Sequence, residues 1–465
     1  MEKPFSLNGI WFLPSSPNRR IRGTLDHCGS FSRLNLYCLS EKEFELFSNL
    51  STLHGLSSNG EKVSLLDCFL ENTSQCSVDE INDIDSQSLM IFNVCIFVNY
   101  FVIGLHIESS ELPMFSSFII DSKFADNFVH RYFHHKNKGA IVDSYLIVYD
   151  CFIKSIQAKF SIVAYQKQSY GRLANKKETI FKFLFELNDI LFSVNNVIKN
   201  SFALFYLMMF MSDEYLDTNS ITSSANGIDV TIFFHNEKKT ERNIHPSQIV
   251  SLYDISEHFP TILERWYTDI NRYIRPSRRY LEILTADFTD DELITMYVRI
   301  VETLIQGVEY IPSTEDNNIL KKLKNTAMEI NDISLKNKCI SAVSYAKKHY
   351  FSTKDIFCNS LLELFNNDKY ISIIYYSVSN AIDIRNNEVH LNETTKVDLQ
   401  EILLKDISLI AMPILLKINF LKQLGVNYTN CIELFNKHDF FILKKSELKQ
   451  LIGKLLDANG ADKLR

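Results

Sequence analysis

The spacing of apolar residues changes partway along this chain, and that change constrains the fold more than any other feature. In the first half, apolar and polar residues alternate in short runs separated by turn signals. The runs are Gly23-Thr24-Leu25, Leu34 to Tyr37, Val63 to Cys68, Met90 to Ile107, Phe115 to Ile120, Tyr145 to Tyr149, Gln157 to Tyr165 and Ile228 to Phe234. Alternation with a period of two is typical of half-buried strands. It predicts a β-rich domain over residues 1–250, either a sandwich or an open barrel.

After about residue 250 the apolar residues follow a helical period instead. Between Asp290 and Tyr310 they fall on one face, and acidic residues at the start of this segment suit the positive end of a helix. The sequence therefore predicts an all-helical domain over residues 251–440 and a solvated, lysine-rich helical tail over 441–465. The fold class expected for the whole chain is α+β.

Several segments set the expected element boundaries. Pro276 is expected to begin a new helical segment, and Pro413 to divide residues 396–424 into two buried helices, because proline lacks the N–H that a helix interior needs. Residues 180–211 have helical spacing, although their phenylalanine content leaves room for a strand. Arg131 to Lys138 is basic and is expected to be a solvated loop.

Composition and absent motifs narrow the class of protein. Hydrophobic residues make up 46% and charged residues 23% of the 465, which is ordinary for a globular protein. Because the net charge is −7, any nucleic-acid binding must come from a local basic patch. No glycine-rich phosphate loop and no nucleophile elbow occurs, so ATPase, dehydrogenase and α/β-hydrolase activities have no local support.

Cysteine usage and hydropathy indicate where the protein acts. The nine cysteines include no C-x2-C pair, so we expect neither a zinc cluster nor a disulfide framework. The longest apolar run, Phe202 to Met211, is too short to span a bilayer, and the first residues lack the pattern of a secretory signal. We therefore expect a cytoplasmic protein with no metal, no cofactor and no membrane partner.

One short motif carries the candidate chemistry. Residues 385–390 are Arg-Asn-Asn-Glu-Val-His, an R-x4-H spacing with an amide directly after the arginine. A guanidinium can fork onto phosphate oxygens and an imidazole can move protons near neutral pH, so Arg385, Asn386 and His390 suit phosphodiester cleavage without a metal. In the structural alternative, Arg385 pairs with Glu388 on one helix face and His390 merely ends the helix.

Two other polar clusters have both functional and structural interpretations. Arg275, Arg278 and Arg279 are candidates for contacts with RNA phosphates, because guanidinium groups neutralise a nucleic-acid backbone. A run of charge is usually a solvated face, and nearby acidic residues such as Glu282 partly neutralise this one. The tract of His130, His134 and His135 resembles a metal site in composition, but Asp126 is the one carboxylate nearby, so solvated surface is expected there.

The motif and its helical surroundings, residues 290–430, resemble a HEPN domain, from a superfamily of helical bundles that includes many ribonucleases. The hallmark is R-x4-6-H with a polar residue after the arginine, which Arg385, Asn386 and His390 match. Several such domains also carry an acidic residue on an early helix that approaches the motif, and Glu302 is the candidate for it here. The alternative for Glu302 is an exposed glutamate that pairs along its own helix.

The N-terminal half resembles the N-terminal domain of the ApeA family. The segments that carry this resemblance are Gly9-Ile10-Trp11-Phe12-Leu13-Pro14, Gly23-Thr24-Leu25, Gly60 to Leu66 with Cys68, and Phe259 to Trp266 with the tract through Glu302. ApeA-like proteins pair this domain with a C-terminal HEPN domain and act in bacterial antiphage defence by cutting RNA and halting the infected cell.

The resemblance implies a metal-independent endoribonuclease. His390 would exchange a proton with the ribose 2′-hydroxyl or the leaving oxygen, and Arg385 would hold the scissile phosphate. Asn386 would orient the histidine or a phosphate oxygen. The implied partners are RNA, of which tRNA is one candidate, a second copy of the chain that completes a composite site, and a phage-derived trigger sensed or relayed by the N-terminal domain. The alternative is a HEPN bundle that binds or assembles without catalysis, while the β-rich domain recognises a phage or host component.

Overall fold

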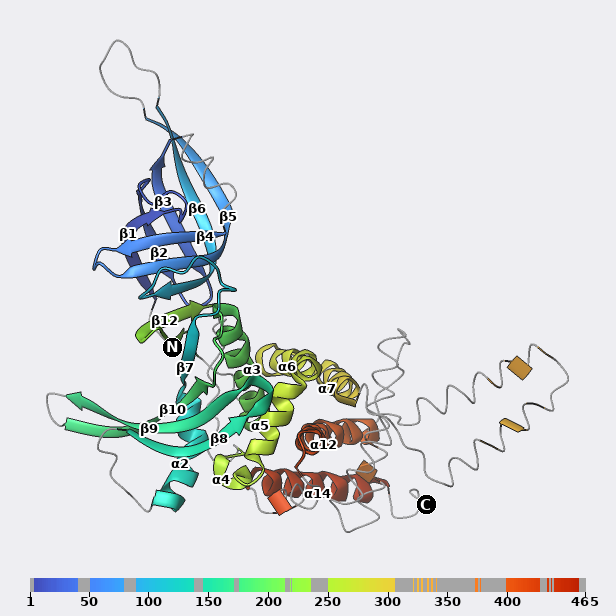
Figure 1. Ribbon diagram of the computed structural model, residues 1–465. Helices are drawn as coiled ribbons and strands as arrows, with labels where there is room; N and C mark the ends of the chain where they lie inside the picture. The colour runs from blue at the N-terminus through green and yellow to red at the C-terminus, as the bar shows by residue number, and fades with distance from the viewer. Residues whose placement is uncertain are drawn as a thin grey trace. The chain divides into compact units, whose positions relative to one another are not determined.

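The computed structural model describes both halves of the chain, with gaps. The described residues are 4–40, 51–78, 89–137, 145–170, 175–213, 218, 220–235, 250–305, 321, 324–325, 328, 333, 336–337, 340, 373–374, 377, 399–426, 433–434, 436 and 439–459. Contacts divide the chain into two compact units, Met1–Thr268 and Asp269–Arg465, and each unit is described by itself. All described strands belong to the first unit, and the described elements of the second are helices (Figure 1).

Six strands of the first unit close into a ring. They are β1 (Phe5–Phe12), β2 (Ile21–His27), β3 (Ser32–Leu39), β4 (Thr52–Ser57), β5 (Lys62–Val78) and β6 (Leu89–Ile103). Their order is β3-β2-β1-β4-β5-β6, and β3 also pairs with β6, with Leu36 opposite Val94. All these pairings are antiparallel. The β3–β6 pairing joins the two ends of the order, so the ring has none of the unpaired edges that an open sheet leaves.

Trp11 shows why the sequence folds into this ring. Its side chain is fully buried, and its Nε1 donates a hydrogen bond to the carbonyl oxygen of Gly23 at 3.1 Å. The indole lies against the backbone of Gly55 on β4, where an added Cβ would overlap the ring. Alternating leucines and valines from the other strands surround it in a single core. The period-two pattern therefore supplies the inward face, and glycine at 55 supplies room for the largest side chain.

Six further antiparallel strands extend from β6. In order they are β12 (Ile228–Phe234), β11 (Ser220–Ala225), β7 (Phe115–Asp121), β10 (Asn175–Leu187), β9 (Ala158–Tyr170) and β8 (Tyr145–Ile153). The helices that pack against these strands are α2 (Lys123–Asn137), α3 (Val194–Ser212) and α5 (Phe259–Thr268), and α4 (Leu252–Ile255) packs against α2. A 3-10 turn, η1 (Lys154–Ile156), joins β8 to β9.

α5 is fixed to the first unit through three side chains. Trp266 Nε1 donates to the carbonyl oxygen of Ala203 at 2.8 Å, and Tyr267 Oη donates to that of Asn200 at 2.9 Å, both on α3. The carboxylate of Glu264 accepts the backbone N–H groups of Lys154 and Ser155 at the start of η1, at 2.6 and 3.1 Å. α5 therefore belongs structurally with the sheet that precedes it.

In the second unit, each long helix packs against the next long helix along the chain. The long ones are α6 (Ile270–Thr285), α7 (Asp290–Ile305), α12 (Leu399–Gln423) and α14 (Asp439–Asn459). α7 contacts α6 and α12, and α12 contacts α14. Thr289 and Glu292 cap α7, because the Glu292 carboxylate accepts the Thr289 N–H at 2.8 Å. Across the described residues, none of the helices combines the length and the apolar character needed to cross a membrane.

The α+β fold class is confirmed, and several local expectations are corrected. Arg131 to Lys138 was expected to be a loop, but residues up to Asn137 continue α2, because Phe128, Val129 and Phe133 give that helix a buried face. Residues 180–211 are divided between the end of β10 and α3.

The two prolines do not end their helices. Pro276 lies inside α6 and Pro413 inside α12, so the expected boundaries at these positions are wrong. Each proline removes one intrahelical donor, but burial of the surrounding turns outweighs that loss. The C-terminal helix α14 also has a buried face, formed by Leu448, Ile452 and Leu455, and is therefore not fully solvated.

Candidate functional site

The R-x4-H motif itself lies outside the described residues. Arg385, Asn386, Glu388 and His390 are all among the residues that the structure does not describe. The other candidate residues are described: Arg275, Arg278 and Arg279 on α6, and Glu302 on α7.

α6 has a buried face and a charged face. Tyr273, Ser277, Tyr280 and Ile283 are buried, while Arg275 and Arg278 are exposed. Successive residues of a helix turn by about 100° around its axis, so this spacing places the aromatic residues and the arginines on different sides. The Tyr273 ring meets Phe420 of α12 edge-on, with centroids 6.2 Å apart. Packing of the buried face therefore fixes the orientation in which the arginines are presented.

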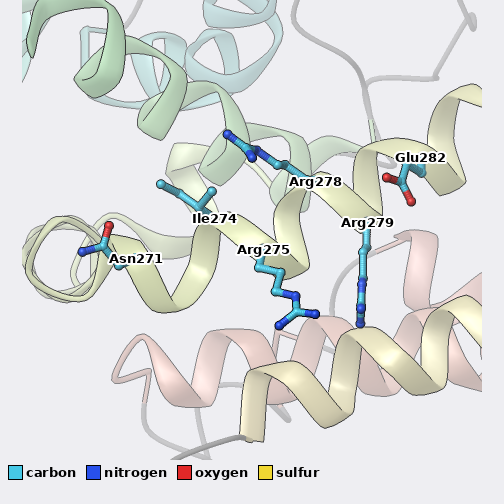
Figure 2. A pocket seen from close by; sticks show the side chains of 6 residues that line it. All are labelled: Asn271, Ile274, Arg275, Arg278, Arg279 and Glu282. Carbon is cyan, nitrogen blue, oxygen red and sulfur yellow. The ribbon is translucent and has the colours of Figure 1, made fainter. Parts of the chain in front are cut away.

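The charged face forms an open groove with a volume of about 480 Å³ (Figure 2). Its lining residues are Asn271, Ile274, Arg275, Arg278, Arg279 and Glu282. Figure 2 shows the side chains of Arg275 and Arg279 extending to the same side of the helix, whereas Arg278 points away from them. The structure thus places all three predicted arginines along one groove, with Arg275 and Arg279 extending to one side and Arg278 to the other.

Arg279 is held in place by α7. Its Nη1 donates to the Thr303 hydroxyl at 3.1 Å and to the carbonyl oxygen of Arg299 at 3.3 Å. Partial burial lowers the pKa of Arg279, and the positive charges of Arg275 and Arg299 lower it further, while Glu282 and Glu302 oppose the shift. This guanidinium is therefore surrounded by an excess of positive charge.

Glu302 lies on α7 and is half-buried. Its charge acts on Arg279, so it belongs to the electrostatic environment of the arginine groove. Arg272, the neighbouring arginine of α6, has a structural role, because its Nη2 donates to the Leu304 carbonyl oxygen at 2.7 Å and to Gln423 Oε1 at 3.2 Å. It ties α6 to α7 and α12 and is not available to a ligand.

Arg299 is the residue that the sequence analysis missed. It is exposed on α7, and both its backbone carbonyl and its charge act on Arg279. The sequence did hold a signal for it. Arg299 lies three residues before Glu302 and four before Thr303, so all three polar residues fall on one side of an otherwise apolar helix.

The histidine tract of α2 forms a pair and not a ligand cluster. The Nε2 atoms of His130 and His134 are 3.0 Å apart, within hydrogen-bond distance, and His135 packs against Tyr253. Over the part of the chain that the structure describes, no group of three or more His, Cys, Asp or Glu side chains has the arrangement of a metal site.

The fold defines a two-part α+β protein, with a β-rich N-terminal unit built around a closed ring and a helical C-terminal unit. Residues 6–266 match the family ApeA N-terminal domain 1. The match covers more than half of the chain, so the protein belongs to this family, and the resemblance found in the motifs from Gly9 to Trp266 is confirmed. The matched region ends at Trp266, the α5 residue that anchors that helix to α3. No protein with a curated description matches the chain.

Proposed function

We propose that this protein is an ApeA-type antiphage defence protein of the bacterial cytoplasm whose C-terminal helical unit is a HEPN endoribonuclease. Membership of the ApeA N-terminal domain family is the observation that carries this proposal. The R-x4-H motif of Arg385 and His390 supports it, because the motif supplies a phosphate-binding cation and a proton carrier. The N-terminal unit would sense a phage-derived trigger or restrain the nuclease.

The proposed reaction uses the RNA's own 2′-hydroxyl as nucleophile. His390 removes the 2′-hydroxyl proton, the 2′-oxygen attacks the adjacent phosphorus, and the P–O5′ bond breaks. Arg385 stabilises the charge that develops on the phosphate oxygens, and Asn386 orients the histidine or an oxygen. A second imidazole must protonate the leaving 5′-oxygen, which gives a homodimer with facing motifs a chemical reason. The arginine groove of α6 would hold RNA away from the cleaved bond.

Substitution of the motif residues tests this proposal. Purified Arg385→Ala and His390→Ala variants should each lose cleavage of total RNA and of tRNA by at least about a hundredfold, with chelator present, because each removes one chemical role. A DNA strand of matching sequence should remain uncut, since it lacks the 2′-hydroxyl. The same variants should lose protection of bacterial cultures against phage.

Two exposed residues provide matched controls. Arg19→Ala in the β1–β2 loop and His130→Ala on α2 remove the same two side-chain types at positions far in sequence from the motif. Both variants should cleave RNA as the wild type does. Undiminished cleavage by both motif variants would remove the nuclease assignment. Absence of cleavage by the wild type, together with phage protection that survives both substitutions, would favour the non-catalytic binding module.

A further inference from the structure

Glu282 and Glu302 only partly offset the positive charge around Arg279 on α6. The positive charges of Arg275 and Arg299 both act on Arg279, and none of the three makes an ion pair with a carboxylate within the described parts of the chain. An arginine keeps its charge at any ordinary pH, so this repulsion cannot be relieved by loss of a proton. A groove lined mostly by one sign of charge raises the local concentration of ligands of the opposite sign.

We propose that Arg275 and Arg279 of α6 and Arg299 of α7 form a phosphate clamp that binds the backbone of an RNA strand. The inference rests on the proposed function, in which RNA is the substrate. It adds Arg299 to the site and assigns the three arginines to a single phosphate position, with Arg278 directed elsewhere along the strand.

Arg279 is prepared for such a ligand. Both of its protein hydrogen bonds are donated by Nη1, to Thr303 and to the Arg299 carbonyl, which fixes the plane of the guanidinium. Its Nε and Nη2 donors make no hydrogen bond to a described residue, and the Arg279 side chain lines the groove (Figure 2). These two donors are the pair that forks onto two oxygens of one phosphate. Arg275 and Arg299, which are exposed, can close on the same group from α6 and α7.

The groove fits a strand better than a single phosphate ion. Its lining residues run from Asn271 to Glu282, which spans about 17 Å along the helix axis. Ile274 offers an apolar surface beside the cations, and Arg278 can reach a neighbouring phosphate from the other side. Glu282 lines the groove too, and its carboxylate repels a phosphate there. A strand with several phosphates can pair with the clamp and with Arg278 at the same time, whereas a single phosphate ion can pair with the clamp alone.

Binding of a labelled single-stranded oligoribonucleotide to the full-length protein tests the clamp. All proteins carry Arg385→Ala and His390→Ala, so the probe stays intact, and anisotropy is measured over a series of KCl concentrations. Arg275→Ala and Arg299→Ala should each weaken binding about tenfold, the usual worth of one charge-assisted hydrogen bond. Each should also reduce the slope of log K against log [KCl] by about 0.7, as expected for one lost phosphate contact on a single strand.

Three further variants make the result specific. Arg279→Lys keeps the charge but loses the fork, and should weaken binding while leaving the salt slope nearly unchanged. Glu282→Gln should strengthen binding about twofold, because it removes a repulsive charge from the groove. Arg19→Ala, which removes an exposed arginine of the first unit, should bind as the parent does. Thermal midpoints within about a degree of the parent show that the exposed substitutions leave the fold intact.

The outcomes separate the clamp from the nuclease assignment. Binding and salt slopes of Arg275→Ala and Arg299→Ala that equal those of Arg19→Ala would overturn the clamp, whatever the cleavage results. Loss of binding in these variants, with RNA cleavage that survives Arg385→Ala and His390→Ala, supports the clamp and overturns the nuclease assignment. A DNA strand should compete equally, since phosphate contacts do not read the sugar, whereas stronger competition by a phosphorylated peptide would overturn the RNA ligand.

Discussion

At the scale of single residues, Asp126 on α2 has the clearest pH dependence. Its Oδ1 accepts the Phe181 N–H at 2.8 Å, and burial raises its pKa to about 6, with a smaller contribution from the charges of Asp121 and Glu178. A raised carboxyl pKa means that the folded state holds more protons than the unfolded state between the ordinary and the raised value. The fold therefore loses stability as the pH rises from about 4 to about 6, where Asp126 ionises, and the loss is complete above that range.

The Asp126→Asn variant removes that ionisation but keeps an oxygen to accept the Phe181 N–H. It should be more stable than the wild type by about 2 kcal/mol at about pH 8, and the difference should shrink to near zero at about pH 4. Urea unfolding at the two pH values measures this. Asp229→Asn, an exposed carboxylate on β12, should leave the wild-type profile unchanged. Destabilisation of Asp126→Asn at the higher pH would contradict the expectation.

At the scale of elements, the attachment of α5 to α3 depends on two buried aromatic side chains. Trp266→Phe removes the hydrogen bond to the Ala203 carbonyl oxygen and leaves a void, so it should lower the unfolding free energy by about 2 kcal/mol. Tyr267→Phe removes only the hydroxyl that donates to Asn200, and should cost about 1 kcal/mol. Chemical unfolding followed by circular dichroism measures both.

Each variant loses one hydrogen bond and Trp266→Phe also loses packing volume, so the difference between them reports the contribution of packing. Tyr253→Phe, an exposed tyrosine on α4, provides the matched control and should change stability little. Equal stability of Trp266→Phe and the control would show that α5 is not held by its tryptophan.

The same elements show what the sequence could and could not predict. Local periodicity predicted β3 from Leu34 to Tyr37 and β12 from Ile228 to Phe234, because alternation is a property of neighbouring residues. Closure of the ring pairs Leu34 with Ile96, and no local pattern specifies such a distant partner. Pro276 was misplaced for a related reason, since its tolerance inside α6 depends on tertiary burial.

In the candidate site too, local sequence predicted some features and tertiary packing determined the others. The concentration of Arg275 and Arg279 was visible in the sequence, because one helical turn separates them. The approach of Arg299 depends on packing of α6 against α7, so sequence spacing could not predict it. The RNA-binding role of these arginines and the catalytic roles of Arg385, Asn386, His390 and Glu302 stay predictions.

At the scale of the whole molecule, the division between the units falls after α5. The compact first unit ends at Thr268 and the family match ends at Trp266, both later than the boundary at residue 250 that the change of period suggests. Leu252, Phe259, Ile262 and Trp266 are buried within the first unit. A chain that ended at residue 250 would leave their contact surface on the sheet and on α3 exposed to water.

Two truncated proteins test this boundary. A protein of residues 1–268 should unfold in one cooperative transition, whereas residues 1–250 should aggregate or lack a transition, because loss of one large buried side chain already costs about 3 kcal/mol against a total stability of about 5–15 kcal/mol. Circular dichroism melts and size-exclusion profiles distinguish the two. Equal folding of both proteins would show that α4 and α5 add nothing to the first unit.

The folded 1–268 protein should also neither cut RNA nor bind the oligoribonucleotide as the full chain does, since it lacks the motif and both helices of the clamp. Retention of either activity by residues 1–268 would move the RNA site into the β-rich unit.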